Sequence, residues 1–369
     1  MNGRRRFLAV LTTMPLWPVL ARAGAADEFE RFKRQQAEDF QGFQDEWLRY
    51  QAAYNSAWAR YQSGLAQVWT KPEMAGRKVW VEYSDNLKVR RTLDFGRNEV
   101  RLSFTAEEAA RLTDERIRAE FERLMASSLS DAWQKDGVLR QLDKQQPGNG
   151  QLSLSGLVPA DWMAMFSQQS RSTDNTSKGQ VVTITIPLPA SALPQRSREY
   201  LPLVQQYASK WQVDPALVLA IMETESSFNP MARSQVPAFG LMQIVPSSAG
   251  RDASKLVYGS EQLLTASQLC TPATNIEMGC AYLNLLDSRY LSAIDNPQSR
   301  LYCVIAAYNT GAGNVARAFS GNNSVADAAK RINRMTPPQV YAHLRSQLKY
   351  EEARNYVQKV TKALQTYSA

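Results

Sequence analysis

The feature that most constrains the fold is an apolar segment that ends in two glutamates, "LVLAIMETESSFNP", residues 217–230. Asp214 and Pro215 precede it, and this pair is typical of a helix start, with aspartate as the N-cap and proline at the first helical position. The pair Asn229-Pro230 predicts where the helix stops, because a proline disfavours helical backbone in the residue before it. The segment therefore predicts a helix with carboxylates near its C-terminal end.

Glu223 and Glu225 cannot both face one cleft. Successive helical residues turn by about 100°, so side chains two apart point about 200° away from each other. Glu225 continues an apolar row formed by Val218, Ile221 and Met222 and followed by Phe228. Burial on that face would raise the pKa of Glu225, as a general acid requires. The alternative is a helix-end carboxylate paired with an arginine, and Glu223 is expected to be solvated.

Three further stretches extend this pattern: "SQVPAFGLMQIVPSSAG" (234–250), "CVIAAYNTGAGNV" (303–315) and "YEEARNYVQKV" (350–360). Together with "ESSFNP", in this order, they resemble the goose-type, lysozyme-like lytic transglycosylases of the bacterial cell wall. The resemblance covers roughly residues 196–369. It implies peptidoglycan glycan strands as the binding partner and substrate, with no cofactor and no metal.

The resemblance implies that Glu225 is the sole acid and base. In this family one carboxyl group protonates the glycosidic oxygen between N-acetylmuramic acid and N-acetylglucosamine. It then removes the proton of the muramic C6 hydroxyl, which closes onto C1 to give a 1,6-anhydro end without water. One candidate carboxylate fits this chemistry, because glycosidases with two carboxylates need a partner at a defined separation. The acetamide of the substrate would supply the nucleophilic help.

Four residues of the second stretch match positions at the family's sugar site. Ser234 corresponds to a serine near the acetamide, and Gln243 to a sugar-binding glutamine. Gly240 would let the backbone approach the saccharide, since glycine has no Cβ atom. Gly240 and Met242 also have a structural interpretation, as a tight turn and as core filling.

Four residues of the last two stretches complete the expected site. Tyr308 corresponds to a cleft tyrosine that supports the charged intermediate and the glutamate. Asn309 is interpreted mainly as the N-cap of a following helix. Tyr356 matches a further cleft tyrosine, and Glu352 a carboxylate that meets the amine of a stem peptide.

The predicted organisation is an α+β N-terminal domain followed by a mainly α, lysozyme-like (goose-type) catalytic domain. Residues 24–66 form an aromatic-rich helical segment, whose aromatic face packs on the chain itself or on a partner. Residues 67–193 form the α+β domain, with strands in 77–104, a helix opened by Thr105 and Glu108, and a strand in 180–189. Residues 194–369 form the catalytic domain. Residues 24–193 would bind glycan, orient the enzyme or recruit cell-wall proteins.

The N-terminus predicts export. Residues 1–23 contain three arginines, an apolar stretch and the small-residue pattern Ala21-Arg22-Ala23, which is typical of a cleaved signal peptide. The general route and the twin-arginine route both fit these arginines. The expected compartment is the periplasm. No cysteine precedes Cys270, so no lipid anchor is expected.

Composition excludes several other functions. The formal charge of +8 falls to about +4 without residues 1–23, and no basic run indicates nucleic-acid binding. His343 is the only histidine, which excludes a histidine-dependent triad and a histidine-rich zinc site. Cys270, Cys280 and Cys303 leave one disulfide or three buried thiols open.

Two alternatives to a lytic transglycosylase remain on the sequence alone. A hydrolytic muramidase of the same fold would need a carboxylate that positions water, and Glu223 faces the wrong way for that. A non-catalytic scaffold that binds peptidoglycan would not need Glu225, Ser234, Gln243 and Tyr308.

Overall fold

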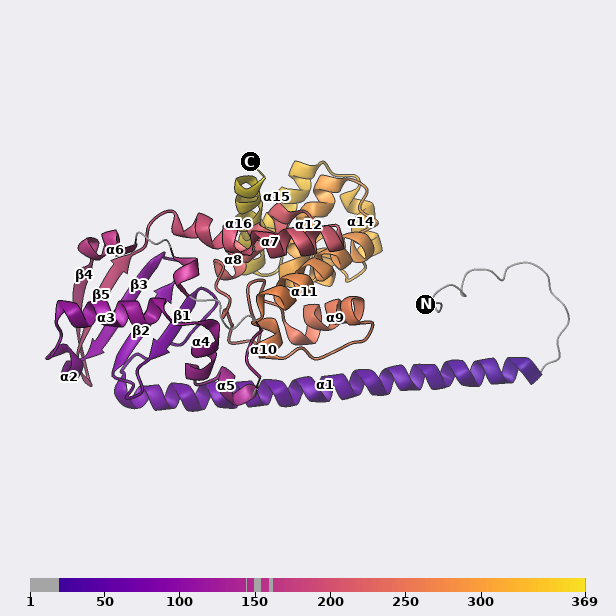
Figure 1. Ribbon diagram of the computed structural model, residues 1–369. Coiled ribbons are helices and arrows are strands. Elements are labelled where there is room, and N and C mark those ends of the chain that lie inside the picture. The colour runs from indigo at the N-terminus through magenta and orange to yellow at the C-terminus, as the bar shows by residue number, and fades with distance from the viewer. Residues whose placement is uncertain (1–19, 144, 149–153, 159–161, 369) are drawn as a thin grey trace. The chain divides into compact units, whose positions relative to one another are not determined.

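The computed structural model describes residues 20–143, 145–148, 154–158 and 162–368 (Figure 1). Most of the predicted signal peptide, residues 1–19, lies outside this part of the chain. The described residues from Trp47 onward form one compact unit, and residues 20–46 belong to a second. None of the helices in the described part combines the length and the apolar character that a membrane span requires.

The N-terminal half of the compact unit contains a five-stranded antiparallel sheet in the order β1-β2-β3-β5-β4. The strands are β1 (Val79–Tyr83), β2 (Val89–Asp94), β3 (Glu99–Thr105), β4 (Ser170–Thr176) and β5 (Gly179–Pro187). Leu102 lies opposite Ile184, and Phe104 opposite Val182, so the central strands share one buried face. Helix α3 (Asp114–Met125) crosses this face of the sheet (Figure 1).

The strands expected in residues 77–104 and 180–189 are present, but β4 was not expected. Its side chains are almost all exposed, so its sequence lacks the alternation of apolar and polar residues that marks a half-buried strand.

The prediction of a single helix that begins after Thr105 is wrong, because two helices form in this segment. The short helix α2 spans Ala106–Ala109, and the Thr105 side chain makes no capping bond. Thr113 instead accepts a 3.3 Å hydrogen bond from the backbone N–H of Arg116 and opens α3. A second N-cap residue within the segment therefore begins a new helix.

The remaining short helices of this half connect the sheet to the C-terminal half. They are α4 (Leu129–Lys135), α5 (Leu139–Leu142) and α6 (Trp162–Met165), with 3₁₀ turns at Leu154–Leu157 and Phe166–Gln168. Arg196 of α7 (Ala192–Trp211) is fully buried and donates to the carbonyls of Leu157 and Phe95. The sheet and the helices that follow it are thus joined through buried polar contacts.

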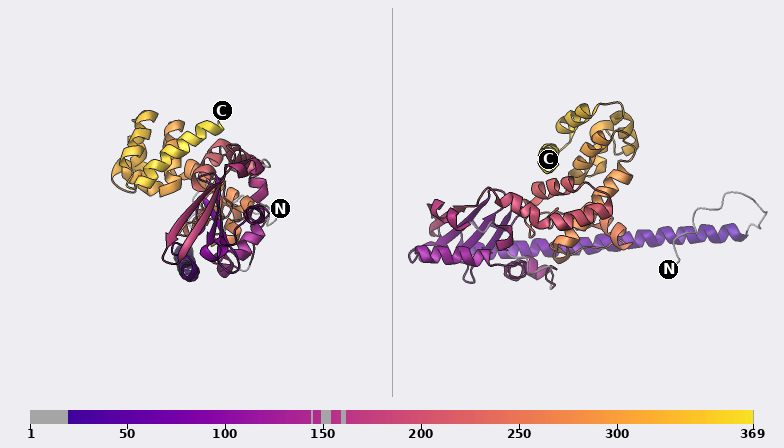
Figure 2. Two further views of the ribbon diagram at one scale, coloured as in Figure 1. Left: turned by 90° about the vertical axis from the view of Figure 1, so that its left-hand side faces the viewer. Right: turned by 45° about the horizontal axis from the view of Figure 1, so that its top comes forward.

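The C-terminal half is helical (Figure 2), and residues 227–245 form its longest connection. Its helices after α7 are α8 (Pro215–Ser226), α9 (Arg251–Tyr258), α10 (Ala266–Leu269), α11 (Pro272–Leu285), α12 (Pro297–Thr310), α13 (Ala312–Ser320), α14 (Val325–Ile332), α15 (Pro337–Gln347) and α16 (Glu351–Tyr367), with π-helical turns at Pro246–Gly250 and Leu286–Tyr290. Helix α8 packs against α7, α11 and α16. An all-round apolar sequence suits such a central position. Cys270, Cys280 and Cys303 are buried free thiols.

Helix α1 (Leu20–Val68) carries the expected aromatic face. Within the compact unit, Tyr50 and Tyr54 of this helix pack on the helical half, whereas Tyr61 contacts Tyr83 of β1 edge-on. Tyr54 is fully buried, contacts the ring of Phe239 edge-on and donates a 2.9 Å hydrogen bond to the carbonyl of Ser234. Tyr50 accepts a 3.1 Å bond from the backbone N–H of Ala266. This part of the aromatic face therefore packs on the chain itself.

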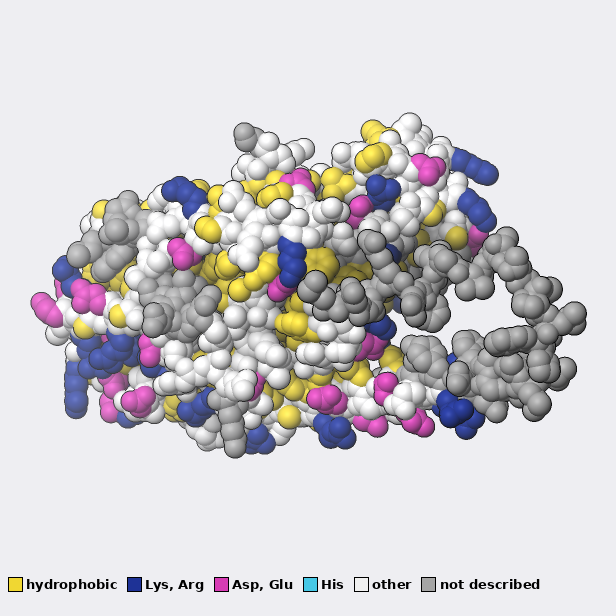
Figure 3. All heavy atoms as spheres, turned by 45° about the vertical axis from the view of Figure 1, so that its right-hand side comes forward, with side chains coloured by type: hydrophobic (Ala, Val, Ile, Leu, Met, Phe, Trp, Pro, Cys, Tyr) yellow, Lys and Arg dark blue, Asp and Glu magenta, His cyan; other side chains and the backbone are white. Residues whose placement is uncertain are grey.

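Charged side chains are mixed on the face that Figure 3 shows, with lysine and arginine interspersed among aspartate and glutamate. On that face the two signs of charge are interspersed, so it does not present a field of a single sign.

Candidate functional site

A cleft of about 450 Å³ opens over the C-terminal end of α8. Its walls come from every part of the chain that the sequence motifs marked and from the segment before β1. The lining residues are Arg77, Glu225, Ser234, Val236, Ala238, Gln243, Val245, Asn309, Thr310, Asn314, Tyr350 and Glu352. Glu225, Ser234, Gln243, Asn309 and Glu352 of the expected site therefore meet in one cavity.

Glu225 lies in the last turn of α8 and is only 5% exposed. Burial raises the pKa of its carboxyl group, because a low-dielectric environment disfavours the charged form. The charge of Arg77 and the nearby hydroxyl of Tyr356 act in the opposite direction on this pKa. Glu225 is thus a buried carboxyl group at the cleft, and burial, Arg77 and Tyr356 have the largest effects on its pKa.

The start of α8 is as expected, but its end is earlier than the sequence suggested. Asp214 accepts a 2.8 Å hydrogen bond from the N–H of Ala216. The helix ends at Ser226, because the Ser226 hydroxyl accepts from the N–H of Phe228 and donates to the carbonyl of Leu241. Phe228 has a φ of 67° and lies outside the helix. It therefore does not continue the helical row of Glu225.

Glu223 does not line the cleft. Its carboxylate accepts a 2.7 Å hydrogen bond from the hydroxyl of Tyr367 in α16, and the side chain is half-buried. The expected separation of the two glutamates is confirmed, although Glu223 is less solvated than expected.

Gly240 has a structural role in place of the expected contact with a saccharide. Its φ is +76°, and a Cβ atom there would lie 2.1 Å from the carbonyl oxygen of Leu269 and 2.3 Å from Nδ2 of Asn275. Gly240 therefore allows close packing of this turn inside the protein, away from the cleft.

Met242 is also a core residue. It is fully buried and fills the space beside Gly279. Its backbone N–H donates a 2.7 Å hydrogen bond to Asn275, and its carbonyl accepts a 2.9 Å bond from the hydroxyl of Tyr308. The core-filling interpretation is the one that the packing supports, and the expected substrate contact of Met242 is wrong because no part of its side chain is exposed.

Ser234 and Gln243 lie in the loop that follows α8, and both line the cleft. The Ser234 hydroxyl is hydrogen bonded to the carbonyl of Val236. Gln243 has a φ of 50° and donates a 3.0 Å bond from Nε2 to the carbonyl of Gly240. Its Oε1 atom is buried and has no hydrogen-bond partner in the described part of the chain. An amide acceptor is therefore available at the cleft.

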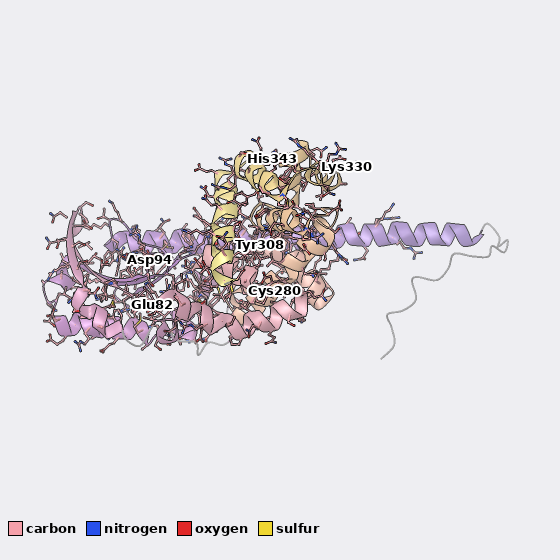
Figure 4. The ribbon with its side chains drawn as sticks, turned by 90° about the horizontal axis from the view of Figure 1, so that it is seen from above. Glu82, Asp94, Cys280, Tyr308, Lys330 and His343 are labelled. Carbon is pink, nitrogen blue, oxygen red and sulfur yellow. The ribbon has the colours of Figure 1, made fainter. Side chains whose placement is uncertain are left out.

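Two tyrosines flank Glu225. Tyr308 lies inside the helical half (Figure 4), and burial together with the charge of Glu225 holds its pKa well above the usual value. Burial and Glu225 raise the pKa of Tyr356 in the same way. The Tyr356 hydroxyl approaches Glu225 without a well-formed hydrogen bond to any described residue. Both phenols are therefore neutral hydroxyl groups beside the carboxyl.

The N-cap role expected for Asn309 is wrong. Asn309 lies within the last turn of α12, and Gly311, with a φ of 84°, precedes α13. The helix boundary falls two residues later than expected, and the Asn309 side chain lines the cleft instead.

Arg77 is the residue of the site that the sequence motifs did not mark. Its Nη2 lies 2.6 Å from Oε2 of Glu225, its Nε donates to the carbonyl of Glu225 at 3.2 Å, and its Nη1 lies 3.1 Å from Oε1 of Glu352. The arginine partner considered as the alternative for Glu225 therefore exists, and it comes from the segment before β1. Glu352 is held by this ion pair and is 71% exposed. No local signal in "AGRKVW" indicates this long-range contact.

Comparison with known proteins agrees with these motifs. Residues 202–330 match the family described as Transglycosylase SLT domain. The chain is 45% identical over 208 residues to membrane-bound lytic murein transglycosylase C of Klebsiella pneumoniae subsp. pneumoniae, and 42% identical to that of Histophilus somni. Each match covers 56% of this chain and 56% of the relative. The chain therefore spans just over half the length of the curated relatives that it matches.

Solved structures give a weaker likeness. The soluble lytic transglycosylase SLT70 of Escherichia coli is 26% identical, with a TM-score of 0.36, and the match covers 48% of this chain and 25% of that one. Residues 202–330 of this chain, which carry Glu225, Ser234, Gln243 and Tyr308, thus match the transglycosylase SLT domain, and the chain is similar to the membrane-bound lytic murein transglycosylases C.

Proposed function

We propose that the chain is a peptidoglycan lytic transglycosylase that cleaves the bond between N-acetylmuramic acid and N-acetylglucosamine and leaves a 1,6-anhydro end. The observation that carries this proposal is the buried carboxyl of Glu225 at the cleft, with a raised pKa and two neutral tyrosine hydroxyls beside it. A carboxyl group of this kind can donate a proton near neutral pH.

One carboxyl group performs both proton transfers in this mechanism. Glu225 gives its proton to the glycosidic oxygen, and the substrate acetamide stabilises C1 from the other face. The Glu225 carboxylate then takes the proton of the C6 hydroxyl, whose oxygen bonds to C1 and closes the anhydro ring. Tyr308 and Tyr356 can stabilise the charges that form during these steps. Ser234 and Gln243 offer polar groups for the acetamide and the sugar.

The carboxylates near Glu225 favour this mechanism over hydrolysis. Glu223 is turned toward Tyr367. Glu352 lines the cleft, but it is exposed and paired with Arg77. An inverting hydrolase needs a carboxylate that is free to activate water, and a retaining one needs a nucleophile close to the acid. Neither Glu223 nor Glu352 is placed for those roles.

The remaining expectations belong to the same proposal. Residues 1–23 act as a signal peptide that sends the chain to the periplasm, where peptidoglycan lies. Residues 24–66, 67–193 and 194–369 act as the helical segment, the α+β domain and the goose-type catalytic domain. The residues before 194 orient the enzyme on the cell wall or recruit cell-wall proteins. Neither a cofactor nor a metal takes part in the proposed reaction.

The test is mass spectrometry of the muropeptides that the mature protein releases from purified sacculi. We expect anhydro-muramyl products from the wild type and none from Glu225→Gln, which keeps the shape of the side chain and loses its acid function. The matched control is Glu352→Gln, which should still give anhydro products. Reducing-end products that require both carboxylates would show a hydrolytic muramidase. A wild type that binds sacculi and releases nothing would show a binding scaffold.

A further inference from the structure

A second cavity of about 450 Å³ lies on the other side of the Arg77–Glu352 ion pair. It is lined by Arg77, Lys78, Thr224, Glu352, Asn355, Tyr356 and Lys359. Arg77 and Glu352 also line the cleft that contains Glu225. The ion pair therefore stands between the two cavities, and one arginine side chain is accessible from both.

Positive charge gathers in this second cavity. Three of its lining residues are cations, and Glu352 is its one acidic lining residue. Burial, together with the nearby charges of Arg77 and Lys359, lowers the pKa of Lys78. Cations that destabilise one another in this way attract an anionic group.

The backbone that carries Arg77 and Lys78 is fixed, whereas the contacts of Arg77 at the cavity are exchangeable. Lys78 Nζ donates a 3.1 Å hydrogen bond to the carbonyl of Glu223, and Asn229 donates to the carbonyls of Gly76 and Arg77 at 3.4 and 3.3 Å. The ion pair with Glu352 is exposed, and exposed ion pairs stabilise a protein little. Another carboxylate can therefore replace Glu352 at Arg77 at small cost.

We propose that this second cavity binds a carboxylate of the peptide attached to the substrate glycan, through Arg77, Lys78 and Lys359, and that the bound carboxylate draws Arg77 away from Glu225. The identity of the ligand rests on the proposed function, because peptidoglycan strands carry peptides with free carboxylates. The guanidinium group is planar with several donors, which suits a carboxylate. The segment before β1 would thereby take part in choosing the substrate.

The exchange would prepare Glu225 for its proposed role. The contact between Arg77 Nη2 and Oε2 of Glu225 at 2.6 Å lowers the pKa of Glu225, against the larger effect of burial. When Arg77 turns to the ligand, Glu225 loses this partner, whereas burial and the neighbouring Glu352 continue to raise its pKa and Tyr356 and Lys78 continue to lower it. The pKa of Glu225 then rises further, which favours the protonated carboxyl when a peptide-bearing strand binds.

The test uses two soluble probes that contain no bond for the enzyme to cut. One is N-acetylmuramyl-L-alanyl-D-isoglutamine, which ends in a carboxylate, and the other is its C-terminal amide. We expect the mature protein to bind the carboxylate form about tenfold more tightly in calorimetry, the size of effect that one charge-assisted hydrogen bond gives. Lys359→Met should remove this preference. The matched control is Lys330→Met, an exposed lysine on α14 outside the cavity (Figure 4), and it should keep the preference.

A second readout follows Glu225 directly by carbon NMR of its labelled carboxyl group. In the wild type the carboxylate probe should raise the pKa of Glu225, and the amide should not. In Arg77→Met the pKa should be higher from the start and unaffected by either probe. Equal binding of the two probes, or an equal effect of Lys359→Met and Lys330→Met, would overturn the carboxylate site. If the protein prefers the carboxylate probe but the pKa of Glu225 does not change, the proposal that Arg77 moves away from Glu225 would be wrong.

These readouts need no turnover, so they separate the two proposals. A protein that passes both binding tests but releases no muropeptide from sacculi would contradict the proposed function and leave the carboxylate site standing. A protein that releases anhydro products and binds both probes equally would contradict only the carboxylate site.

Discussion

At the scale of single residues, the site depends on one buried carboxyl group whose proton affinity is set by its neighbours. In the proposed mechanism Glu225 must carry a proton to act as an acid, so activity should fall as pH rises through its pKa. The alkaline side of the pH profile of kcat/KM reports this pKa in the free enzyme.

Tyr356→Phe tests that dependence. The Tyr356 hydroxyl approaches Glu225 and lowers its pKa, because a nearby hydroxyl donor favours the charged carboxylate. Its removal should therefore move the alkaline side of the pH profile upward. Tyr308→Phe is the comparison, because the Tyr308 hydroxyl donates to the carbonyl of Met242; it should leave the position of that limb unchanged. Equal shifts in both variants would mean that the tyrosines act only through general packing.

Gly240→Ala tests the structural role of the motif glycine. Gly240 and Gly259 both have a positive φ, but a Cβ atom would clash only at Gly240, because Gly259 has nothing within 4 Å. Gly259→Ala should lower the free energy of unfolding by about 1 kcal/mol, from backbone strain alone. Gly240→Ala should lower it by about 1–3 kcal/mol more. Urea denaturation measures both, and equal losses would contradict the packing role.

The residues of the site were only partly predictable from sequence. Glu225 could be found because helical periodicity and the motif agree on it. The cleft positions of Ser234 and Gln243 follow from the motif. The role of Gly240 could not be read, since the clash with Leu269 and Asn275 depends on a neighbour distant in sequence. Arg77 could not be predicted for the same reason, because it lies 148 residues from Glu225 in the sequence.

At the scale of elements, helix α1 supports the cleft through its buried Tyr54. Tyr54 holds the carbonyl of Ser234, a cleft residue, while Tyr50 holds the N–H of Ala266. Tyr54→Phe and Tyr50→Phe should each lower the free energy of unfolding by about 1 kcal/mol. Only Tyr54→Phe should raise KM for sacculi, because only its partner lines the cleft. A KM effect of the same size in Tyr50→Phe would contradict a specific support of this loop.

The elements themselves were predictable where burial leaves a periodic pattern. The apolar helix around Glu225 and the strands β1, β2, β3 and β5 have that pattern. Strand β4 has none, because its side chains are exposed and it is held by pairing with β5. The break between α2 and α3 depends on which of two threonines caps a helix, a small energy difference that the sequence alone does not decide.

At the scale of the whole molecule, the sheet-containing half and the helical half share one compact unit. Arg233, in the loop after α8, is 1% exposed on its side chain and forms an ion pair with Asp136 after α4, which is 8% exposed. Removal of one partner of a buried pair costs about 3–5 kcal/mol, since the other charge stays buried. Arg233→Met should therefore destabilise both halves together.

Calorimetry of the mature protein measures this coupling. We expect one unfolding transition in the wild type, and one transition at lower temperature in Arg233→Met. Arg97→Met is the control, since Arg97 is 74% exposed and its ion pairs are long; its transition should stay near the wild type. Two transitions in the wild type would show that the halves fold independently. This coupling could not be predicted from the sequence. The change to a helical pattern near residue 194 indicates a boundary between two domains.

The central claim is that Glu225 alone cleaves the glycan without water. Digestion of purified sacculi in water enriched in oxygen-18, followed by mass spectrometry of the released muropeptides, tests it most directly. We expect the wild type to release muramyl ends that contain no oxygen-18 and are lighter by one water than hydrolysed ends, and we expect Glu225→Gln to release none. Muramyl ends that carry oxygen-18 at C1 would contradict the claim.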